Sequence, residues 1–242
     1  MKQKKDAKEN KTASYSIKEQ PDNSTCGPTA LHSVYRHYGE EISIDDVISQ
    51  VGQIPGGGTF APILGTHALN KGYSVKMYTF NMRVFDPSWF DPPYHDDPQY
   101  LISKLQQQAK VKRSPRLKIV TEAYINFLKK GGKIFFEDLT SGLLQRYLKS
   151  NIPIITGLSS TYLYRSKREH NDKSDDIRGK SAGHFVVLYH YNKETKQVSV
   201  ADPYSPKEML RHRHYQVNLS RLVCAILLGV LSYDANLLII EK

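Results

Sequence analysis

The most reactive side-chain type in the chain stands where a helix is expected to begin. Cys26 is one of two cysteines among 242 residues and lies in the segment QPDNSTCGPTAL, where Ser24 or Thr25 can cap a helix and Pro28 suits its first turn. A cysteine at a helix N-terminus faces unpaired backbone N–H groups and the positive end of the helix dipole, and both favour the thiolate. We therefore predict that Cys26 is a nucleophile.

Gln20 is the candidate partner of this cysteine in stabilising negative charge. The turn-forming residues PDNST separate it from Cys26 and can fold its side chain back toward the sulfur. A side-chain amide, together with the backbone N–H of Cys26, is a suitable donor to a developing oxyanion. Cys224 has no comparable context, because it stands among Leu, Val and Ile, so we expect it to be a small buried hydrophobic residue.

An imidazole that could serve the thiol, and an acceptor that could orient it, follow one another late in the chain. His184 comes directly after Gly183 at the start of an expected strand, and Asp202 comes directly after the next expected strand. Nucleophilic cysteines work with such imidazole–carboxylate pairs. A histidine at a strand start and an Asp-Pro turn are each common structural features as well, so the prediction depends on their joint occurrence with Cys26.

The turn between the two strands decides whether the pair can meet. If residues 192–196 form a five-residue turn, residue 184 lies opposite residue 204. Opposite residues of an antiparallel pair share a face, so His184 and Asp202 become diagonal neighbours. A slip of one residue in this register would break the pairing.

Three segments, QPDNSTCGPTAL, GHFVVLYHYN and VSVADPYS, resemble the motif blocks of the bacteriocin-processing peptidase family and its stand-alone relatives, which are papain-fold cysteine peptidases. The segment GTFAPILGTHALNKGYSVKMYTF also resembles the part after the nucleophile helix in those relatives, so the likeness covers most of the chain from Gln20 onward. The resemblance implies that Cys26 is the nucleophile and His184 the general base and later the acid. It further implies that Asp202 orients the imidazole and that Gln20 completes the oxyanion hole.

The chain departs from the transporter-linked members of that family. They commonly carry Asp directly before the cysteine, where this chain has Thr25, and here no transmembrane or ATPase part follows. We therefore expect a function other than leader-peptide export. Longer insertions at residues 86–118 and 163–182 also indicate a different substrate.

The order of the expected elements indicates an α+β fold. Helical spacing dominates the first half of the chain and strand-like segments the second, which favours N-terminal helices carrying the nucleophile, packed on an antiparallel β-sheet. The resemblance implies that this is the papain-like arrangement. We expect residues 1–13 to be a disordered basic tail and residues 14–242 to form a single domain. The expected helices are residues 26–38, 43–51, 59–69, 99–112, 117–130, 141–150 and 219–231, and the expected strands are 73–80, 152–158, 184–191, 197–201 and 236–241.

Composition excludes several classes of protein. Hydrophobic residues make up 39% of the chain, enough to build a core, and two cysteines cannot supply a disulfide framework or a thiolate zinc site. The basic N-terminus is not followed by an apolar segment, and the longest apolar run, residues 222–231, is too short to span a bilayer. We expect a cytoplasmic protein with no membrane span, and secretion without a leader stays open. The net charge of +10 permits anionic partners without requiring them.

Other motifs are weaker. Gly56-Gly57-Gly58 is not followed by Lys-Ser/Thr, so we interpret it as a loop bordering the active cleft rather than a phosphate loop. His212 and His214 stand in the basic segment MLRHRHY, whose arginines oppose a cation, so a solvated basic face is favoured over a metal site. The acidic run at residues 91–97 fits no calcium-binding loop. Without a recognisable reader motif, no specific nucleic acid is expected as a partner.

The sequence therefore predicts a cysteine peptidase that hydrolyses a peptide or isopeptide bond of a peptide or protein substrate and needs no cofactor or metal. Cys26, His184, Asp202 and Gln20 are the predicted catalytic residues. A transpeptidase, a transglutaminase-like enzyme or a deamidase would use the same acyl-enzyme, and a peptide-binding module without turnover would keep the same cleft. The substrate and the oligomeric state do not follow from the sequence.

Overall fold

The first helix begins at Cys26, as the proline and capping signals predicted. The computed structural model describes residues 15–93, 97–171, 173–204 and 213–242. The expected basic tail lies outside these residues, and both it and the single domain stay predictions. The helices are α1 (Cys26–His37), α2 (Ile44–Val51), α3 (Ala61–Asn70), α4 (Pro98–Val111), α5 (Pro115–Lys129), α6 (Ser141–Leu148), α7 (Ser160–Tyr164) and α8 (Leu219–Leu228), with 3-10 turns η1 (Pro87–Phe90) and η2 (Gly229–Ser232).

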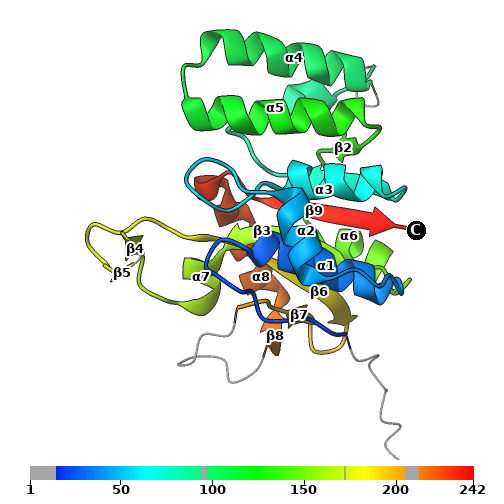
Figure 1. The fold of residues 1–242 in the computed structure, drawn as a ribbon, viewed down its shortest axis with the longest axis vertical. Coiled ribbons are helices and arrows are strands. Elements are labelled where there is room, and N and C mark those ends of the chain that lie inside the picture. The colour runs from blue at the N-terminus through cyan, green and yellow to red at the C-terminus, as the bar shows by residue number, and fades with distance from the viewer. Residues whose placement is uncertain (1–14, 94–96, 172, 205–212) are drawn as a thin grey trace, which may run out of the picture.

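A seven-stranded sheet in the order β2-β1-β9-β3-β6-β7-β8 runs through the molecule (Figure 1). Every neighbouring pair is antiparallel except β1 and β2, so the predicted α+β class with an antiparallel sheet is confirmed. Its strands are β1 (Ser74–Thr79), β2 (Lys133–Phe135), β3 (Ile154–Ser159), β6 (Gly183–Asn192), β7 (Gln197–Ala201), β8 (His214–Asn218) and β9 (Asn236–Glu241), and β4 (Glu169–His170) and β5 (Lys173–Ser174) form a separate hairpin.

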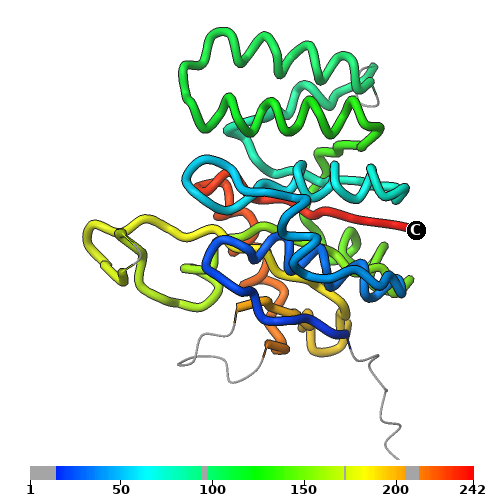
Figure 2. The backbone as a smooth tube through the Cα atoms, in the orientation of Figure 1, coloured from blue at the N-terminus to red at the C-terminus, as the bar shows by residue number. Residues whose placement is uncertain are grey.

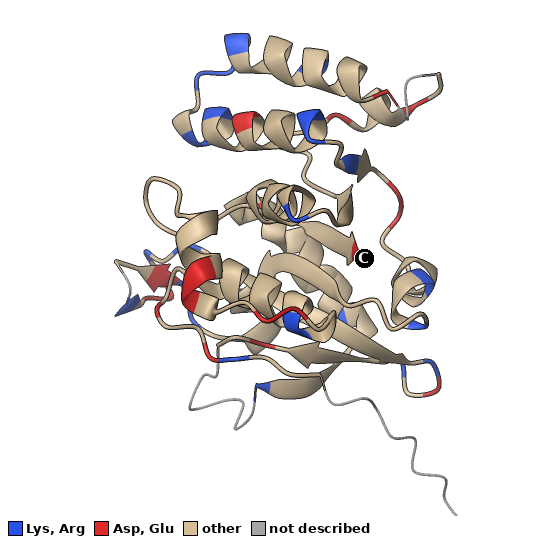
Figure 3. Cartoon of the chain, turned by 45° about the vertical axis from the view of Figure 1, so that its right-hand side comes forward, with Lys and Arg blue, Asp and Glu red and all other residues tan. Residues whose placement is uncertain are grey.

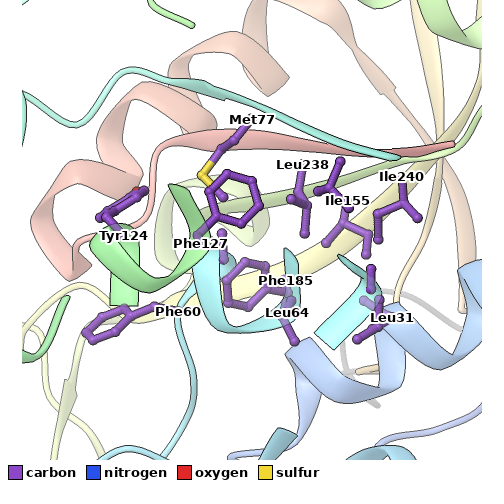
Figure 4. Close-up of a cluster of buried hydrophobic side chains, with 14 of the residues drawn as sticks. Leu31, Phe60, Leu64, Met77, Tyr124, Phe127, Ile155, Phe185, Leu238 and Ile240 are labelled. Atoms are coloured by element: carbon purple, nitrogen blue, oxygen red, sulfur yellow. The ribbon is translucent and has the colours of Figure 1, made fainter. Parts of the chain in front are cut away.

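The central strands are buried on both faces. Ile155, Phe185 and Leu238 pack with α1, α3 and α5 in one hydrophobic cluster. Figure 4 shows these three side chains together with Phe127 and Leu64. Their chain neighbours, among them Ile154, belong to a second cluster with α6 and α8 on the other face. This explains why β3 and β9 read as continuous apolar runs rather than as alternating strands.

The insertion at residues 86–118 contains α4 and the first residues of α5, and these two helices form a hairpin that stacks on α3 (Figures 1 and 2). Close packing here depends on Gly65 in α3, where a Cβ atom would come 2.6 Å from the ring of Phe127 in α5. Charged residues lie mainly on such helices and loops, whereas the central strands are largely uncharged (Figure 3). No helix among the described residues is long and apolar enough to cross a bilayer.

The C-terminal helix differs from its prediction. The sequence predicts one helix over residues 219–231, but α8 ends at Leu228 and η2 follows. A Cβ atom at Gly229 would come 2.8 Å from the backbone nitrogen of Ala235, so the chain turns tightly there. Cys224 was expected to be buried and is exposed, because it lies on the outward face of α8 while Leu222, Ala225 and Ile226 face the core.

Candidate active site

The turn that carries Cys26 is held by Asp22. Its carboxylate accepts hydrogen bonds of 2.7 Å from the backbone nitrogen and the hydroxyl of Ser24, and its carbonyl accepts one of 3.2 Å from Thr25 Oγ1. Thr25 occupies the N-cap position, as predicted, but its side chain does not cap α1. The first-turn N–H groups beside the sulfur therefore have no capping side chain.

Gly27 lets the first turn of α1 approach the sheet. A Cβ atom at this position would come 2.5 Å from Thr59 Cγ2 and 3.3 Å from a ring carbon of Phe185. Phe185 is the chain neighbour of His184. The missing side chain thus brings Cys26 next to the strand that carries the imidazole.

His184 and Asp202 meet, as predicted. The Nε2 atom of His184 lies 2.7 Å from Oδ1 of Asp202, and both side chains are buried. The predicted five-residue turn is wrong, because Asn192 already pairs with Gln197. A bulge between Leu188 and His190 then shifts the register by one, so that Leu188 pairs with Val200 as the prediction required.

Asp202 accepts four hydrogen bonds from described residues, two on each oxygen. Besides His184, the backbone nitrogen of Tyr204 donates to Oδ1 at 2.9 Å. The hydroxyls of Tyr164 and Tyr215 donate to Oδ2 at 2.5 Å and 2.7 Å. Burial alone would raise the pKa of Asp202, but the charge of His184 and these hydrogen bonds lower it below its usual value, so the group is a carboxylate.

The two tyrosines were not identified from the sequence. Burial and the charge of Asp202 raise the pKa values of Tyr164 and Tyr215 well above 10, so both stay protonated and act as donors. Tyr215 comes from β8, and Tyr164 comes from α7, a short helix that the sequence analysis did not predict and that ends at the start of the insertion at residues 163–182. Tyr215 ends the segment MLRHRHY, in which only the histidines and arginines were considered, and that segment was interpreted as a basic face.

The imidazole of His184 links the carboxylate to the thiol. Burial lowers its pKa, but the charge and hydrogen bond of Asp202 and the hydrogen bond and charge of Cys26 outweigh burial and raise the pKa to about 10. Because Nε2 is bonded to Asp202, Nδ1 is the ring nitrogen left for Cys26. At neutral pH the ring is therefore an imidazolium held between a carboxylate and the cysteine sulfur.

Gln20 lies on the same loop as Cys26. Its backbone nitrogen donates to the carbonyl of Pro203 at 2.9 Å, which ties this loop to the residue after Asp202. Its side-chain nitrogen donates to the carbonyl of Asp22 at 2.7 Å, and its Oε1 is buried without a partner among the described residues. One hydrogen of the amide remains for another acceptor.

Asp234 is a second buried carboxyl group beside the site, and sequence reasoning missed it. A Cβ atom at Gly157 would come 2.9 Å from Asp234 Cβ, and one at Gly183 would clash with its Oδ2. Burial raises the pKa of Asp234 to about 7, while the hydrogen bond from Ser232 and the charges of Arg116 and His184 act to lower it. This carboxyl group therefore titrates near neutral pH next to the imidazole.

The weaker motifs of the sequence lie partly within the described residues. Within the described ranges, no three His, Cys, Asp or Glu side chains gather as a metal site would need. His212 and part of the acidic run at 91–97 lie outside those ranges. Gly57 has a positive φ and lies beside the turn that carries Cys26. A Cβ atom on Gly57 would come 3.8 Å from Ser24 Cβ, which agrees with a loop that borders the site.

Comparisons with known proteins point to one family. The Peptidase_C39 like family matches residues 102–221, a segment that includes His184 and Asp202 but not Cys26 or Gln20. A search of curated proteins found no significant match.

Two solved structures align with nearly the whole chain. The peptidase domain of Streptococcus ComA, a bi-functional ABC transporter involved in a quorum sensing pathway, is 16% identical with a TM-score of 0.43 over 95% of this chain and 99% of that one. A Bacillus anthracis protein described as a C39-like peptidase is 11% identical with a TM-score of 0.47 over 94% and 95%. Both TM-scores are below 0.5. By its motif blocks and by the matched segment, the chain resembles the papain-fold cysteine peptidases of the Peptidase_C39 like family.

Proposed function

We propose that the chain is a cysteine peptidase that cleaves a peptide or isopeptide bond through Cys26, His184 and Asp202. The observation that carries this proposal is the unbroken chain of contacts from the Cys26 thiol through the His184 imidazole to the Asp202 carboxylate. The hydrogen bond and the charge of Cys26 are among the causes that raise the pKa of His184, which joins the thiol to the imidazole–carboxylate pair.

In the proposed first step, the Cys26 thiolate attacks the carbonyl carbon and a C–S bond forms. The carbonyl oxygen becomes an oxyanion that accepts hydrogen bonds from the backbone N–H of Cys26 and the free hydrogen of the Gln20 amide. Nδ1 of His184 then gives its proton to the leaving nitrogen as the C–N bond breaks. The amine departs, and an acyl-enzyme remains on the sulfur.

In the second step, the neutral imidazole takes a proton from water, and the resulting hydroxide attacks the thioester. Collapse of this second tetrahedral intermediate breaks the C–S bond and returns the thiolate and the imidazolium. Throughout, Asp202 holds Nε2 and keeps Nδ1 directed at the sulfur. The hydrogen bonds of Tyr164 and Tyr215 fix the carboxylate in that position.

Alkylation by iodoacetamide tests the thiolate–imidazolium pair, and Cys224 is a built-in control because it is exposed and has no imidazole partner among the described residues. We expect Cys26 to be alkylated rapidly at about pH 6, where an ordinary thiol with a pKa of about 8.5 reacts slowly. The rates at the two cysteines are read by peptide mapping in the wild type and in His184→Ala. If Cys26 follows the pH dependence of Cys224, the paired site does not exist.

Acyl transfer to an amine and side-chain deamidation would begin with the same acyl-enzyme. Incubation with a pool of synthetic peptides in H₂¹⁸O separates the reactions by product mass. Hydrolysis places ¹⁸O in a new C-terminal carboxyl group, whereas transfer joins two peptides and deamidation leaves the chain intact. Alkylation without any product would assign the site to a peptide-binding module.

A further inference from the structure

A pocket of about 370 Å³ opens beside the strand that carries His184. Ser159 at the end of β3 pairs with Gly183, the residue before His184, and Ser159 Oγ lies 2.8 Å from Ser181 Oγ in the pocket wall. Ser181 stands three residues before His184, at most about 11 Å along an extended chain. The pocket wall and His184 are therefore close enough for one bound peptide to contact both.

Three arginines line the pocket, and none of them pairs with a carboxylate among the described residues. Arg221 donates to the carbonyls of Tyr162 and Leu163 at 3.0 Å and 3.2 Å, and its guanidinium lies 5.4 Å from the Tyr162 ring centre. These partners fix the guanidinium in place without neutralising its charge.

The other two arginines come from the segment after α7. Arg168 donates to the backbone carbonyl of Ile177 at 3.5 Å and also to that of Asp176, and these too are uncharged partners. Arg165 ends α7 in the left-handed conformation, where its backbone N–H donates to the carbonyl of Tyr162, and its side chain has no partner among the described residues. Two acidic side chains of this segment have ion-pair partners outside the pocket, Asp175 in Arg178 at 2.7 Å and Asp176 in Lys167 at 3.8 Å, and Asp175 also interacts electrostatically with Arg168. Figure 3 shows both signs of charge around the β4–β5 hairpin that follows.

The remaining lining suits a side chain with an apolar stem. Leu231 is 58% exposed and Leu228 is 38% exposed at the rim, whereas hydroxyl groups of Ser159 and Ser181 lie in the wall. A methylene stem would contact the leucines while its carboxylate meets the guanidinium groups. A nucleic-acid backbone would instead require a row of cations along an open groove with stacking aromatic rings.

From this arrangement we propose that the pocket formed by Arg165, Arg168 and Arg221 binds an acidic side chain of the peptide substrate, close to the scissile bond. The inference rests on the proposed peptidase activity and adds a charge requirement to it. Recognition needs only non-covalent contacts, so it can be measured separately from turnover.

The test uses the full chain with Cys26→Ala, which binds without cleaving, and a set of fluorescein-labelled peptides in which one position carries Glu, Gln or Lys. Fluorescence polarisation gives the affinities, and each peptide is made with a free and with an amidated C-terminus. We expect a Glu peptide to bind about tenfold more tightly than its Gln partner, which corresponds to about 1.4 kcal/mol. Amidation should leave this preference unchanged, because the recognised group is a side chain rather than the C-terminal carboxylate.

Arg165→Gln and Arg168→Gln should each reduce the preference for Glu, and Arg165→Glu should shift it toward Lys. Lys193→Gln is the matched control, since Lys193 is an exposed basic residue in the turn at the far end of β6. Equal affinity for Glu and Gln peptides, or no binding of either, overturns the inference. So does a preference that disappears on amidation, or a single-stranded oligonucleotide that displaces the peptide from the parent but not from Arg165→Gln.

The same peptides given to the wild-type chain separate the two proposals. Cleavage without preference for Glu would refute the pocket while leaving the peptidase intact. A preference for Glu in binding, with no cleavage of any peptide, would refute the peptidase while leaving the pocket intact.

Discussion

Thr59 lies so close to Gly27 that a Cβ atom on Gly27 would come 2.5 Å from Thr59 Cγ2. The contact joins the start of α1 to the segment before α3, and Phe185 of β6 closes the same space at 3.3 Å. The position of Cys26 relative to His184 is therefore set by packing around a residue that has no side chain. This contact leads to the first prediction.

Gly27→Ala should lower the free energy of unfolding by about 1–3 kcal/mol, the usual cost of overpacking, and should slow the alkylation of Cys26 near neutral pH. Urea denaturation and peptide mapping measure the two effects. Thr59→Ser removes the Cγ2 atom, so the double variant Gly27→Ala/Thr59→Ser should recover part of the stability and part of the alkylation rate. Wild-type stability and alkylation in Gly27→Ala would show that the first turn of α1 has room to move.

Tyr215→Phe and Tyr164→Phe should each reduce kcat by about tenfold, because a hydrogen bond to a charged group contributes about 1.5–3 kcal/mol. Loss of a donor also raises the pKa of Asp202, so the acidic limb of the pH–rate profile should move to higher pH. Tyr191→Phe is the control, since Tyr191 lies in β6 and has no hydrogen bond to Asp202 among the described residues. An equal loss of activity in Tyr191→Phe would show that the loss does not depend on donation to Asp202.

The raised pKa of His184 makes stability depend on pH. The folded protein keeps a proton there up to a pKa of about 10, whereas the unfolded chain releases it near 6.5. The stabilising contribution is therefore complete below pH 6.5 and is lost as pH rises toward 10. Urea denaturation over this range should show the decline in the wild type and in His170→Gln but not in His184→Gln. An unchanged slope in His184→Gln would contradict the pairing.

Asp234 should destabilise the fold once it ionises. Its pKa is raised from 3.8 to about 7, so stability should fall between these pH values as the unfolded chain releases a proton that the folded one retains. Asp234→Asn removes this term, and the variant should be more stable than the wild type above pH 7. Thermal unfolding at pH 5 and pH 8 measures the difference. If the variant gains nothing at the higher pH, the carboxyl group does not carry the raised pKa.

The sequence was informative where the position of a residue depends on local structure. Helix-start signals placed Cys26 at the start of α1, and the strand-end patterns placed His184 and Asp202 within contact of each other. Tyr164 and Tyr215 did not follow, because they reach Asp202 from α7 and β8, and contacts between distant elements leave no local pattern. Asp234 lies between two residues of positive φ, Tyr233 and Ala235, which ordinary propensities do not indicate.

The predicted register between β6 and β7 places Asp202 correctly, although the predicted turn is wrong. A turn one residue shorter than predicted and a bulge near Tyr189 compensate each other. Bulges arise from how a strand twists within its sheet, and spacing alone does not predict them.

Because of that bulge, His184 and Asp202 lie on the same face of the sheet. If the pairing of Asn192 with Gln197 continued unbroken, Asp202 would stand opposite residue 187, an odd number of positions from His184, and the two side chains would leave the sheet on opposite sides. Because the bulge shifts the register by one residue, Asp202 instead stands opposite residue 186. That residue is an even number of positions from His184, so the two side chains share a face. Within the paired segments, inserting or deleting one residue would therefore place the two side chains on opposite faces and abolish the contact. Inserting or deleting two residues would keep them on one face and only change their separation along the strands.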